Sequence, residues 1–226
     1  MLDFLLNLPK GRAPRFLFIG AHCDDIEIGC GGTAIELLRA YPDAGVNWVV
    51  LSSGAARARE ARQASQALLR GVRDAHVSIK DFRESVFPSQ MLEIKQFFEE
   101  MKRTMSPDVV FAHYREDLHQ DHRVVGELVW NTFRDHVILE YEIPKFDGGL
   151  GSPSVFVPVS RAAMKRKIAL LMKVFRSQHG KTWFTPDTFQ GLMRLRGIEC
   201  NAPSGYAEAF YSRKLVLGGA ARSRSR

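Results

Sequence analysis

The sequence predicts an α/β fold, with a Rossmann-like, mostly parallel sheet, helices on both faces and a small C-terminal extension. Short apolar runs alternate with amphipathic stretches across the first two-thirds of the chain, a pattern typical of strand–helix–strand units. Polar clusters follow two of the apolar runs, where the strands of a parallel sheet end. The 226 residues suffice for one such domain. We expect a single domain over residues 1–216 and a disordered basic tail over 217–226.

The first expected unit is a strand over residues 15–19, followed by a turn and a helix. The run Arg-Phe-Leu-Phe-Ile has no polar residue after its first position, which indicates a strand buried on both faces. Three of the four residues in 29–32 are glycine, so we expect a tight turn there. Thr33 is then expected to cap a helix that runs to about residue 40.

The remaining elements follow the same alternation. Further strands are expected near residues 48–51, 76–79 and 108–112, with helices over 57–70, 90–104 and 124–133. Strands joined by crossover helices predict a parallel sheet covered on both faces. Beyond it we expect a loop over 144–158, helices over 162–175 and 185–196, and a strand pair within 207–216.

Composition restricts the class of protein. Apolar residues make up 45% and charged residues 25% of the chain, as in ordinary soluble domains. The sequence contains no apolar run of about 18 residues, so we expect no membrane span. The first 15 residues lack the pattern of a signal peptide. Cys23, Cys30 and Cys200 form no CxxC pair, which argues against a disulfide scaffold. We therefore expect a cytoplasmic protein.

The net charge of +7 is unevenly distributed. Residues 161–226 carry 14 Lys and Arg against 3 Asp and Glu, whereas the rest of the chain is slightly acidic. One interpretation is a solvated surface, and the other is attraction of an anionic substrate such as a phosphorylated or nucleotide-linked sugar. Nucleic-acid binding fits less well, because no recognition motif and no basic run interleaved with aromatic residues is present.

The chemistry-bearing residues concentrate in two of the three loops that should meet at one edge of the sheet, residues 20–32, 52–56 and 113–122. The first loop places His22, Asp24 and Asp25 directly after a strand. The last contains three histidines and three acidic residues within ten positions. Imidazole and carboxylate ligands together suit zinc, whose catalytic sites use three protein ligands and leave one position open. Each cluster alone also fits a turn or a helix start, but two at the same sheet edge indicate a site.

These residues resemble the signatures of the PIG-L/LmbE-like de-N-acetylase family. Residues 22–25 are similar to its His-x-Asp-Asp motif, and residues 119–122 to its His-x-Asp-His motif. The helix that begins near Arg57 and the later Ser-Gln-His at 177–179 resemble further family elements. Cys23 stands where members often have proline, and Ile26 where many have glutamate. Neither position is a ligand in the family pattern.

The resemblance implies a zinc-dependent hydrolase of linear amides that removes an N-acetyl group from an amino sugar or its conjugate. The zinc ligands it implies are His22, Asp25 and His122. Asp24 takes the general-base position, and His119 is expected to be a protonated donor to the oxyanion or the leaving amine. Asp121 is expected to orient an imidazole. Arg57 and Asp117 are assigned to substrate binding.

Other functions remain as alternatives. A phosphate-ester hydrolase with an aspartyl nucleophile normally uses Asp-x-Asp, which the adjacent Asp24 and Asp25 do not match. A metal-stabilised binding module without catalysis would not require Asp24 or His119 beside the ligands. The glycines do not form the GxGxxG motif of a dinucleotide site. The basic C-terminal third favours an anionic or nucleotide-linked N-acetyl sugar, and the sequence is compatible with a homo-oligomer.

Overall fold

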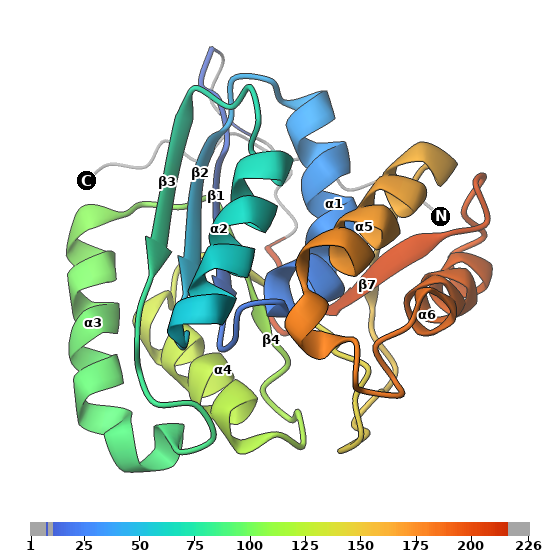
Figure 1. The fold of residues 1–226 in the computed structure, drawn as a ribbon. Coiled ribbons are helices and arrows are strands. Elements are labelled where there is room, and N and C mark those ends of the chain that lie inside the picture. The colour runs from blue at the N-terminus through green and yellow to red at the C-terminus, as the bar shows by residue number, and fades with distance from the viewer. Residues whose placement is uncertain (1–7, 9–10, 217–226) are drawn as a thin grey trace.

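The computed structural model describes residue 8 and residues 11–216. A seven-stranded sheet with the order β3-β2-β1-β4-β5-β7-β6 forms the centre (Figure 1). Its first five strands are parallel, and β7 runs antiparallel to both β5 and β6. The strands are β1 (Arg15–Gly20), β2 (Gly45–Val50), β3 (Asp74–Ile79), β4 (Val109–His113), β5 (Val137–Tyr141), β6 (Val155–Pro158) and β7 (Ala207–Tyr211). The expected α/β fold with a mostly parallel sheet is confirmed.

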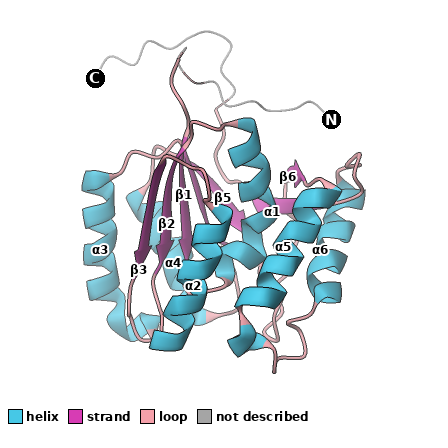
Figure 2. Ribbon diagram, turned by 45° about the horizontal axis from the view of Figure 1, so that its top comes forward, coloured by secondary structure: helices cyan, strands magenta, loops and turns pink. Residues whose placement is uncertain are grey.

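Helices cover both faces of the sheet (Figures 1 and 2). In the described residues they are α1 (Asp25–Ala40), α2 (Ala55–Leu68), α3 (Met91–Thr104), α4 (Gln120–Thr132), α5 (Arg161–Val174) and α6 (Pro186–Glu199). Short 3₁₀ segments lie at Phe87–Gln90 and Arg176–Gln178. None of the helices described is long and apolar enough to cross a membrane.

The alternation of side chains along β1 explains why two hydrophobic layers form. Phe16 and Phe18 lie in a cluster with residues of α1 and α2. Leu17 and Ile19 lie in a second cluster, with residues of α3 and α4. Because successive side chains of a strand point to opposite faces, a fully apolar strand must be covered on both sides.

The start of α1 differs from the sequence prediction. A glycine turn was expected at residues 29–32 with a helix after it, but the helix begins at Asp25 and is kinked at Cys30, which has φ −145°. The tight packing explains the glycine at position 29, where a Cβ atom would lie 2.2 Å from the Tyr141 ring. Thr33 does not cap the helix with its side chain. Its backbone N–H and that of Gly32 instead donate to the Glu208 carboxylate.

Two strands were missed in the sequence. β5 was not expected, and β6 lies inside the segment assigned to a loop. The two strands have only five and four residues, and β6 follows a stretch of glycine and proline that conceals its periodicity. α4 also begins at Gln120, four residues earlier than expected, which places Asp121 and His122 in its first turn. The expected tail over 217–226 lies outside the described residues.

Candidate metal centre and active site

The polar clusters meet where the strand order reverses. β1 and β4 are neighbours in the sheet, and their following elements run to opposite sides of it. In open α/β sheets this crevice, outside the carboxyl ends of the strands, is where ligands bind. A cavity of about 260 Å³ lies here, and its lining includes His22, Asp24, Asp25, Arg57, His119 and His122. The fold therefore joins two segments that lie about a hundred residues apart in the sequence.

Three of the lining side chains have the spacing of a metal site. His22 Nδ1 lies 3.2 Å from His122 Nε2 and 3.3 Å from Asp25 Oδ2. His122 Nε2 lies 3.6 Å from Asp25 Oδ1. Ligands about 2.0–2.1 Å from a tetrahedral zinc ion are roughly 3.3–3.4 Å from one another. The donor types and their separations thus fit zinc.

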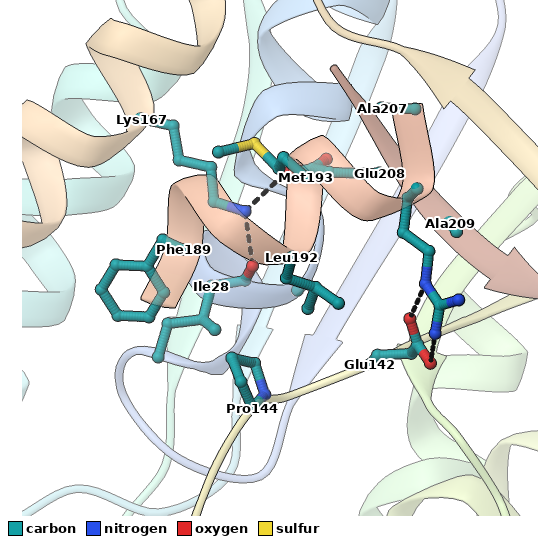
Figure 3. A pocket seen from close by; sticks show the side chains of 12 residues that line it. Ile28, Glu142, Pro144, Lys167, Phe189, Leu192, Met193, Ala207, Glu208 and Ala209 are labelled. Atoms are coloured by element: carbon teal, nitrogen blue, oxygen red, sulfur yellow. Dashed lines mark hydrogen bonds and ion pairs between the residues drawn. The ribbon is translucent and has the colours of Figure 1, made fainter. Parts of the chain in front are cut away.

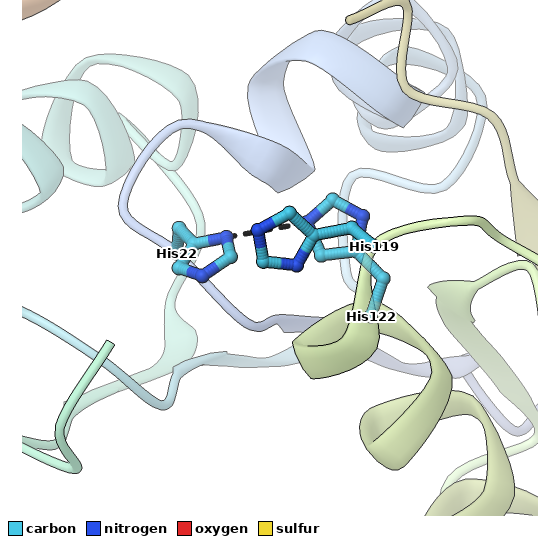
Figure 4. A group of neighbouring side chains, drawn as sticks. All are labelled: His22, His119 and His122. Atoms are coloured by element: carbon cyan, nitrogen blue, oxygen red, sulfur yellow. Dashed lines mark hydrogen bonds between the residues drawn. The ribbon is translucent and has the colours of Figure 1, made fainter. Parts of the chain in front are cut away.

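Two segments of the chain, the residues after β1 and the start of α4, bring the histidines to the centre (Figure 4). His22 follows β1, whereas His119 and His122 belong to the start of α4. The ring centroids of His22 and His119 are 5.0 Å apart, and those of His119 and His122 are 4.6 Å apart. His22, His119 and His122 form one group able to hold a metal, and Asp25, His113 and His122 form a second. Because both groups share His122, they describe alternative ligand choices around one centre.

His113 is closer to this centre than the sequence indicated. The sequence assigned it no role in the site, but it is fully buried, and its Nε2 lies 3.0 Å from Asp25 Oδ2. Its ring stacks on that of His122 with the centroids 3.8 Å apart. His113 is the last residue of β4, and this position at the carboxyl end of a strand was the signal available in the sequence.

Each of two ligand candidates has its own carboxylate behind it. His22 Nε2 lies 3.1 Å from Asp121 Oδ2, and His122 Nδ1 lies 3.2 Å from Asp117 Oδ2. Asp121 also accepts hydrogen bonds from the backbone N–H groups of Ser85 and Phe87. Such partners fix the tautomer and the orientation of a metal-binding imidazole. The orienting role expected for Asp121 stays a prediction, and the contact places its carboxylate against His22.

Asp117, assigned to substrate binding from the sequence, is not among the residues that line the cavity. Its side chain is buried, and Oδ2 contacts both His122 and Lys145 Nζ, the latter at 2.8 Å. Oδ1 accepts a hydrogen bond from the backbone N–H of His119. With both oxygens engaged, Asp117 is placed to support His122 and the loop rather than to receive a sugar hydroxyl.

Asp24 and Asp25 point to different partners. Asp24 Oδ1 accepts a hydrogen bond of 2.9 Å from Arg57, whereas Asp25 faces the imidazoles. Burial raises the pKa of Asp24, although the Arg57 guanidinium opposes this shift. Burial would also raise the pKa of Asp25, but the nearby His122, His113 and His22 outweigh it and hold the pKa well below its usual value. The two adjacent carboxyls thus differ in basicity, as separate ligand and base roles require.

The histidines differ in the same way. Burial alone would lower the pKa of His22, but the Asp25 and Asp121 carboxylates outweigh it and raise the pKa to about 10. Burial and the proximity of His113 lower the pKa of His122 to about 3. Without a metal, His22 therefore carries a proton that partly compensates the surrounding carboxylates, and a bound cation would take over this role.

The environment does not favour a protonated His119, contrary to the expectation from the sequence. Burial and the neighbouring His22 lower the pKa of His119. Its Nδ1 accepts a hydrogen bond of 3.2 Å from the backbone N–H of Asp121, so the hydrogen of the neutral ring is on Nε2. A neutral imidazole with this tautomer still donates one hydrogen bond. His119 can therefore stabilise an oxyanion without being charged.

Arg57 holds one side of the cavity together. Its guanidinium donates to Asp24 and, at 2.7 Å, to both carboxylate oxygens of Glu84. Glu84 was not singled out in the sequence, where it lies in an irregular segment without a recognisable pattern. Arg57 lines the cavity, but its donors are shared between two carboxylates. Its geometry favours positioning of Asp24 over the substrate contact assigned from the sequence.

A second, much smaller cavity of about 20 Å³ is lined by residues of α1, α5, α6 and β7, and two buried ion pairs belong to its lining (Figure 3). Lys167 Nζ lies 2.6 Å from Glu208 Oε1 and also donates to the carbonyl of Ile28. Arg196 donates to both carboxylate oxygens of Glu142. The Glu208 carboxylate accepts hydrogen bonds from the backbone N–H groups after the kink of α1, so the Lys167–Glu208 pair stabilises the helix that carries Asp25. Two of the basic residues of the C-terminal third are thus internal.

Comparison with known families identifies the chain. The sequence model of the family described as PIG-L, GlcNAc-PI de-N-acetylase, matches residues 17–133, more than half of the chain and the whole of the donor set. The chain belongs to the PIG-L family. It is 29% identical over 185 residues to a protein of Escherichia coli K12 called uncharacterized deacetylase YaiS, and this match covers 76% of the chain and 97% of that protein.

Solved structures share the fold of this chain. The N,N'-diacetylchitobiose deacetylase from Pyrococcus horikoshii is 21% identical with a TM-score of 0.66, over 93% of this chain and 87% of that one. GalB, the 4-carboxy-2-hydroxymuconate hydratase from Pseudomonas putida, is 17% identical with a TM-score of 0.69, over 92% of this chain and 100% of that one. One fold thus serves two chemistries among these proteins, and for this PIG-L member the reaction must be argued from its site.

Proposed function

We propose that the chain is a zinc-dependent N-deacetylase that hydrolyses the acetamide of a small N-acetylated amino sugar or its conjugate. The observation that carries this proposal is the pair of adjacent carboxyls with different surroundings. Asp25 faces His22 and His122 at the spacing of metal ligands, while Asp24 faces Arg57 and remains outside that set. A closed structural metal site would not require the second carboxyl. Membership of a deacetylase family supports the same reaction.

The proposed ligands are His22 through Nδ1, Asp25, and His122 through Nε2. Zinc held there would polarise the amide carbonyl and lower the pKa of water from about 15.7 to about 7. Asp121 receives the hydrogen of His22 Nε2, which leaves the Nδ1 lone pair free for a ligand bond. Asp117 Oδ2 lies 3.2 Å from His122 Nδ1, the ring nitrogen that is not proposed as a ligand.

Asp24 is the proposed general base. Its raised pKa brings it nearer to the working pH than an ordinary aspartate, which suits a group that first accepts and then returns a proton. It takes a proton from the attacking water and delivers it to the amine as the C–N bond breaks, so the products are acetate and the free amino sugar. The Nε2–H of His119 donates a hydrogen bond to the oxyanion that develops on the carbonyl oxygen.

The size of the cavity agrees with a small substrate. Its volume of about 260 Å³ lies near the lower end of the roughly 300–1,000 Å³ typical of small-molecule sites. Phe146 and Trp183 contribute aromatic surface to the lining, and apolar walls with a few polar groups are usual in such sites. A single amino-sugar unit fits this description better than a polymer.

The proposal is tested by metal content and acetate release measured together in wild type, His122→Ala and Asp24→Asn. Elemental analysis should find close to one zinc per chain in wild type and in Asp24→Asn, and little in His122→Ala. Acetate release from N-acetylglucosamine and its glycosides should fall by about 10²–10⁴-fold in Asp24→Asn, the usual contribution of a general base. Full zinc occupancy in His122→Ala would remove it from the ligand set. Wild-type turnover in Asp24→Asn would exclude Asp24 as the base.

A further inference from the structure

Among the cations that line the active-site cavity in the described part of the chain, Lys181 differs from Arg57 and Lys145. Arg57 is neutralised by Asp24 and Glu84, and Lys145 by Asp117. No carboxylate of the described residues lies within ion-pair distance of Lys181. Its ammonium instead lies 5.4 Å from the centroid of the Trp183 ring. The cavity therefore has a cationic group available for a ligand.

The segment that carries Lys181 is held in place by α2. The Glu60 carboxylate accepts hydrogen bonds from the backbone N–H of Ser177, at 3.0 Å, and from its hydroxyl. The backbone N–H of Lys181 donates to the carbonyl of Gln178, and its own carbonyl accepts from Phe184. Phe184 is buried against Phe189, with ring centroids 5.1 Å apart. These contacts hold the segment 177–184, of which Lys181 and Trp183 line the cavity.

Two charged side chains of the cavity lining, Lys181 and Asp147, have no ion-pair partner among the described residues. Asp147 lies in the segment between β5 and β6, whereas Lys181 lies between α5 and α6. Arg57 is already paired with Asp24 and Glu84, so Lys181 supplies a positive charge that these residues do not neutralise. An anionic group of a substrate is favoured beside Lys181 and disfavoured beside Asp147.

We propose that Lys181 determines specificity by binding a carboxylate or phosphate group attached to the amino sugar, beside the Trp183 ring. The proposal rests on the deacetylase function of the preceding section and narrows its substrate class from N-acetylated sugars in general to anionic ones. The proposal also assigns substrate binding to one residue of the basic C-terminal third rather than to its overall charge. Within the described residues of that third, Lys167 and Arg196 are buried in ion pairs, and Lys181 is the basic residue that lines the cavity.

Binding of deacetylated products tests the proposal without turnover. The probes are methyl glucosaminide, glucosamine 1-phosphate and glucosamine 6-phosphate, titrated calorimetrically into the zinc-loaded protein. We expect at least one phosphate to bind wild type about fivefold or more tightly than the neutral glycoside, the size of a partly exposed charge-assisted contact. Lys181→Met should remove this preference and leave the affinity for methyl glucosaminide within twofold. Added salt should weaken the preference in wild type.

Two control variants separate a local contact from general charge effects. Lys173 is an exposed lysine of α5 that does not line the cavity, so Lys173→Met should keep the preference. Asp147→Asn should keep or strengthen it, because a like charge is removed from the cavity. Equal binding of all three probes to wild type would overturn the proposal. So would a preference that survives in Lys181→Met, because the phosphate would then contact the metal.

The outcomes also distinguish this proposal from the proposed function. If N-acetylglucosamine glycosides release acetate but Lys181→Met changes no affinity, the deacetylase function stands and the role of Lys181 is wrong. If phosphate probes bind through Lys181 but no N-acetyl sugar, charged or neutral, is hydrolysed, the anion contact stands and the deacetylase function is wrong.

Discussion

Replacing Asp121 by asparagine tests whether the carboxylate behind His22 supports metal binding. Asp121 Oδ2 lies 3.1 Å from His22 Nε2 and accepts a hydrogen bond of 2.6 Å from the Ser85 N–H, while Oδ1 accepts one of 3.0 Å from the Phe87 N–H. All three contacts require an acceptor. Asparagine offers one oxygen and one NH₂ group, so in either orientation at least one donor faces another donor.

The magnitude follows from the bond that is lost. A hydrogen bond to a charged group contributes about 1.5–3 kcal/mol. If the NH₂ group faces His22, the ring loses the partner that keeps its hydrogen on Nε2 and Nδ1 free. Loss of such partners weakens metal binding by about 10–100-fold. That corresponds to about 1.4–2.7 kcal/mol, close to the range expected for the bond itself.

The assay is the zinc dissociation constant, measured by competition with a chromophoric chelator at fixed pH, together with the urea midpoint of the metal-free protein. Gln120→Ala is the matched control. Its side chain donates to the carbonyl of Ser85 and thus ties together the same two loops without contacting His22. We expect Asp121→Asn to weaken zinc binding by 10–100-fold and Gln120→Ala by less than threefold. A zinc affinity of Asp121→Asn within twofold of wild type would refute the reasoning.

Two further predictions concern the packing that holds the site. Gly29→Ala places a Cβ atom 2.2 Å from the Tyr141 ring and should lower the free energy of unfolding by about 1–3 kcal/mol or more. Gly191 lies in α6 with open space around it, so Gly191→Ala should raise the free energy of unfolding by about 0.4–1 kcal/mol. Equal urea midpoints for the two variants would contradict this. Lys167→Met leaves the buried Glu208 carboxylate without its ammonium partner and should cost about 3–5 kcal/mol, part of which the double variant Lys167→Met/Glu208→Gln should recover. A double variant less stable than Lys167→Met would contradict this. It would show that the Glu208 carboxylate stabilises α1 through the backbone N–H groups even without the ammonium.

The sequence was informative where function depends on strand ends. The apolar runs before His22 and before the 113–122 loop have the composition of buried strands, and chain topology then requires their carboxyl ends to meet at one edge. That reasoning needs only local pattern and the geometry of parallel sheets. It correctly located the region that the structure brings together, although the roles within it remain predictions.

The parts that could not be predicted depend on contacts between distant residues. Glu84 reaches Arg57 from 27 positions away, and Lys145 reaches Asp117 from 28. Nothing in the local sequence of either residue indicates its partner. The kink in α1 likewise depends on Glu208, about 175 residues further along the chain. His119 shows the same limit for electrostatics, because its pKa depends on how deeply the folded chain buries it beside His22.

Different segments of the chain carry the proposed metal-binding residues and Lys181, the proposed specificity residue. The loop 113–122 carries His122 together with Asp117 and Asp121, the carboxylates behind His122 and His22. One proposed ligand and the two carboxylates that contact the proposed ligand histidines are therefore encoded within a few adjacent positions. Lys181 lies in a segment about 60 residues later, which is held to α2 through Glu60. Because that segment shares no hydrogen bond with the donor set among the described residues, substitutions at position 181 should change which sugar is bound and leave metal affinity unchanged.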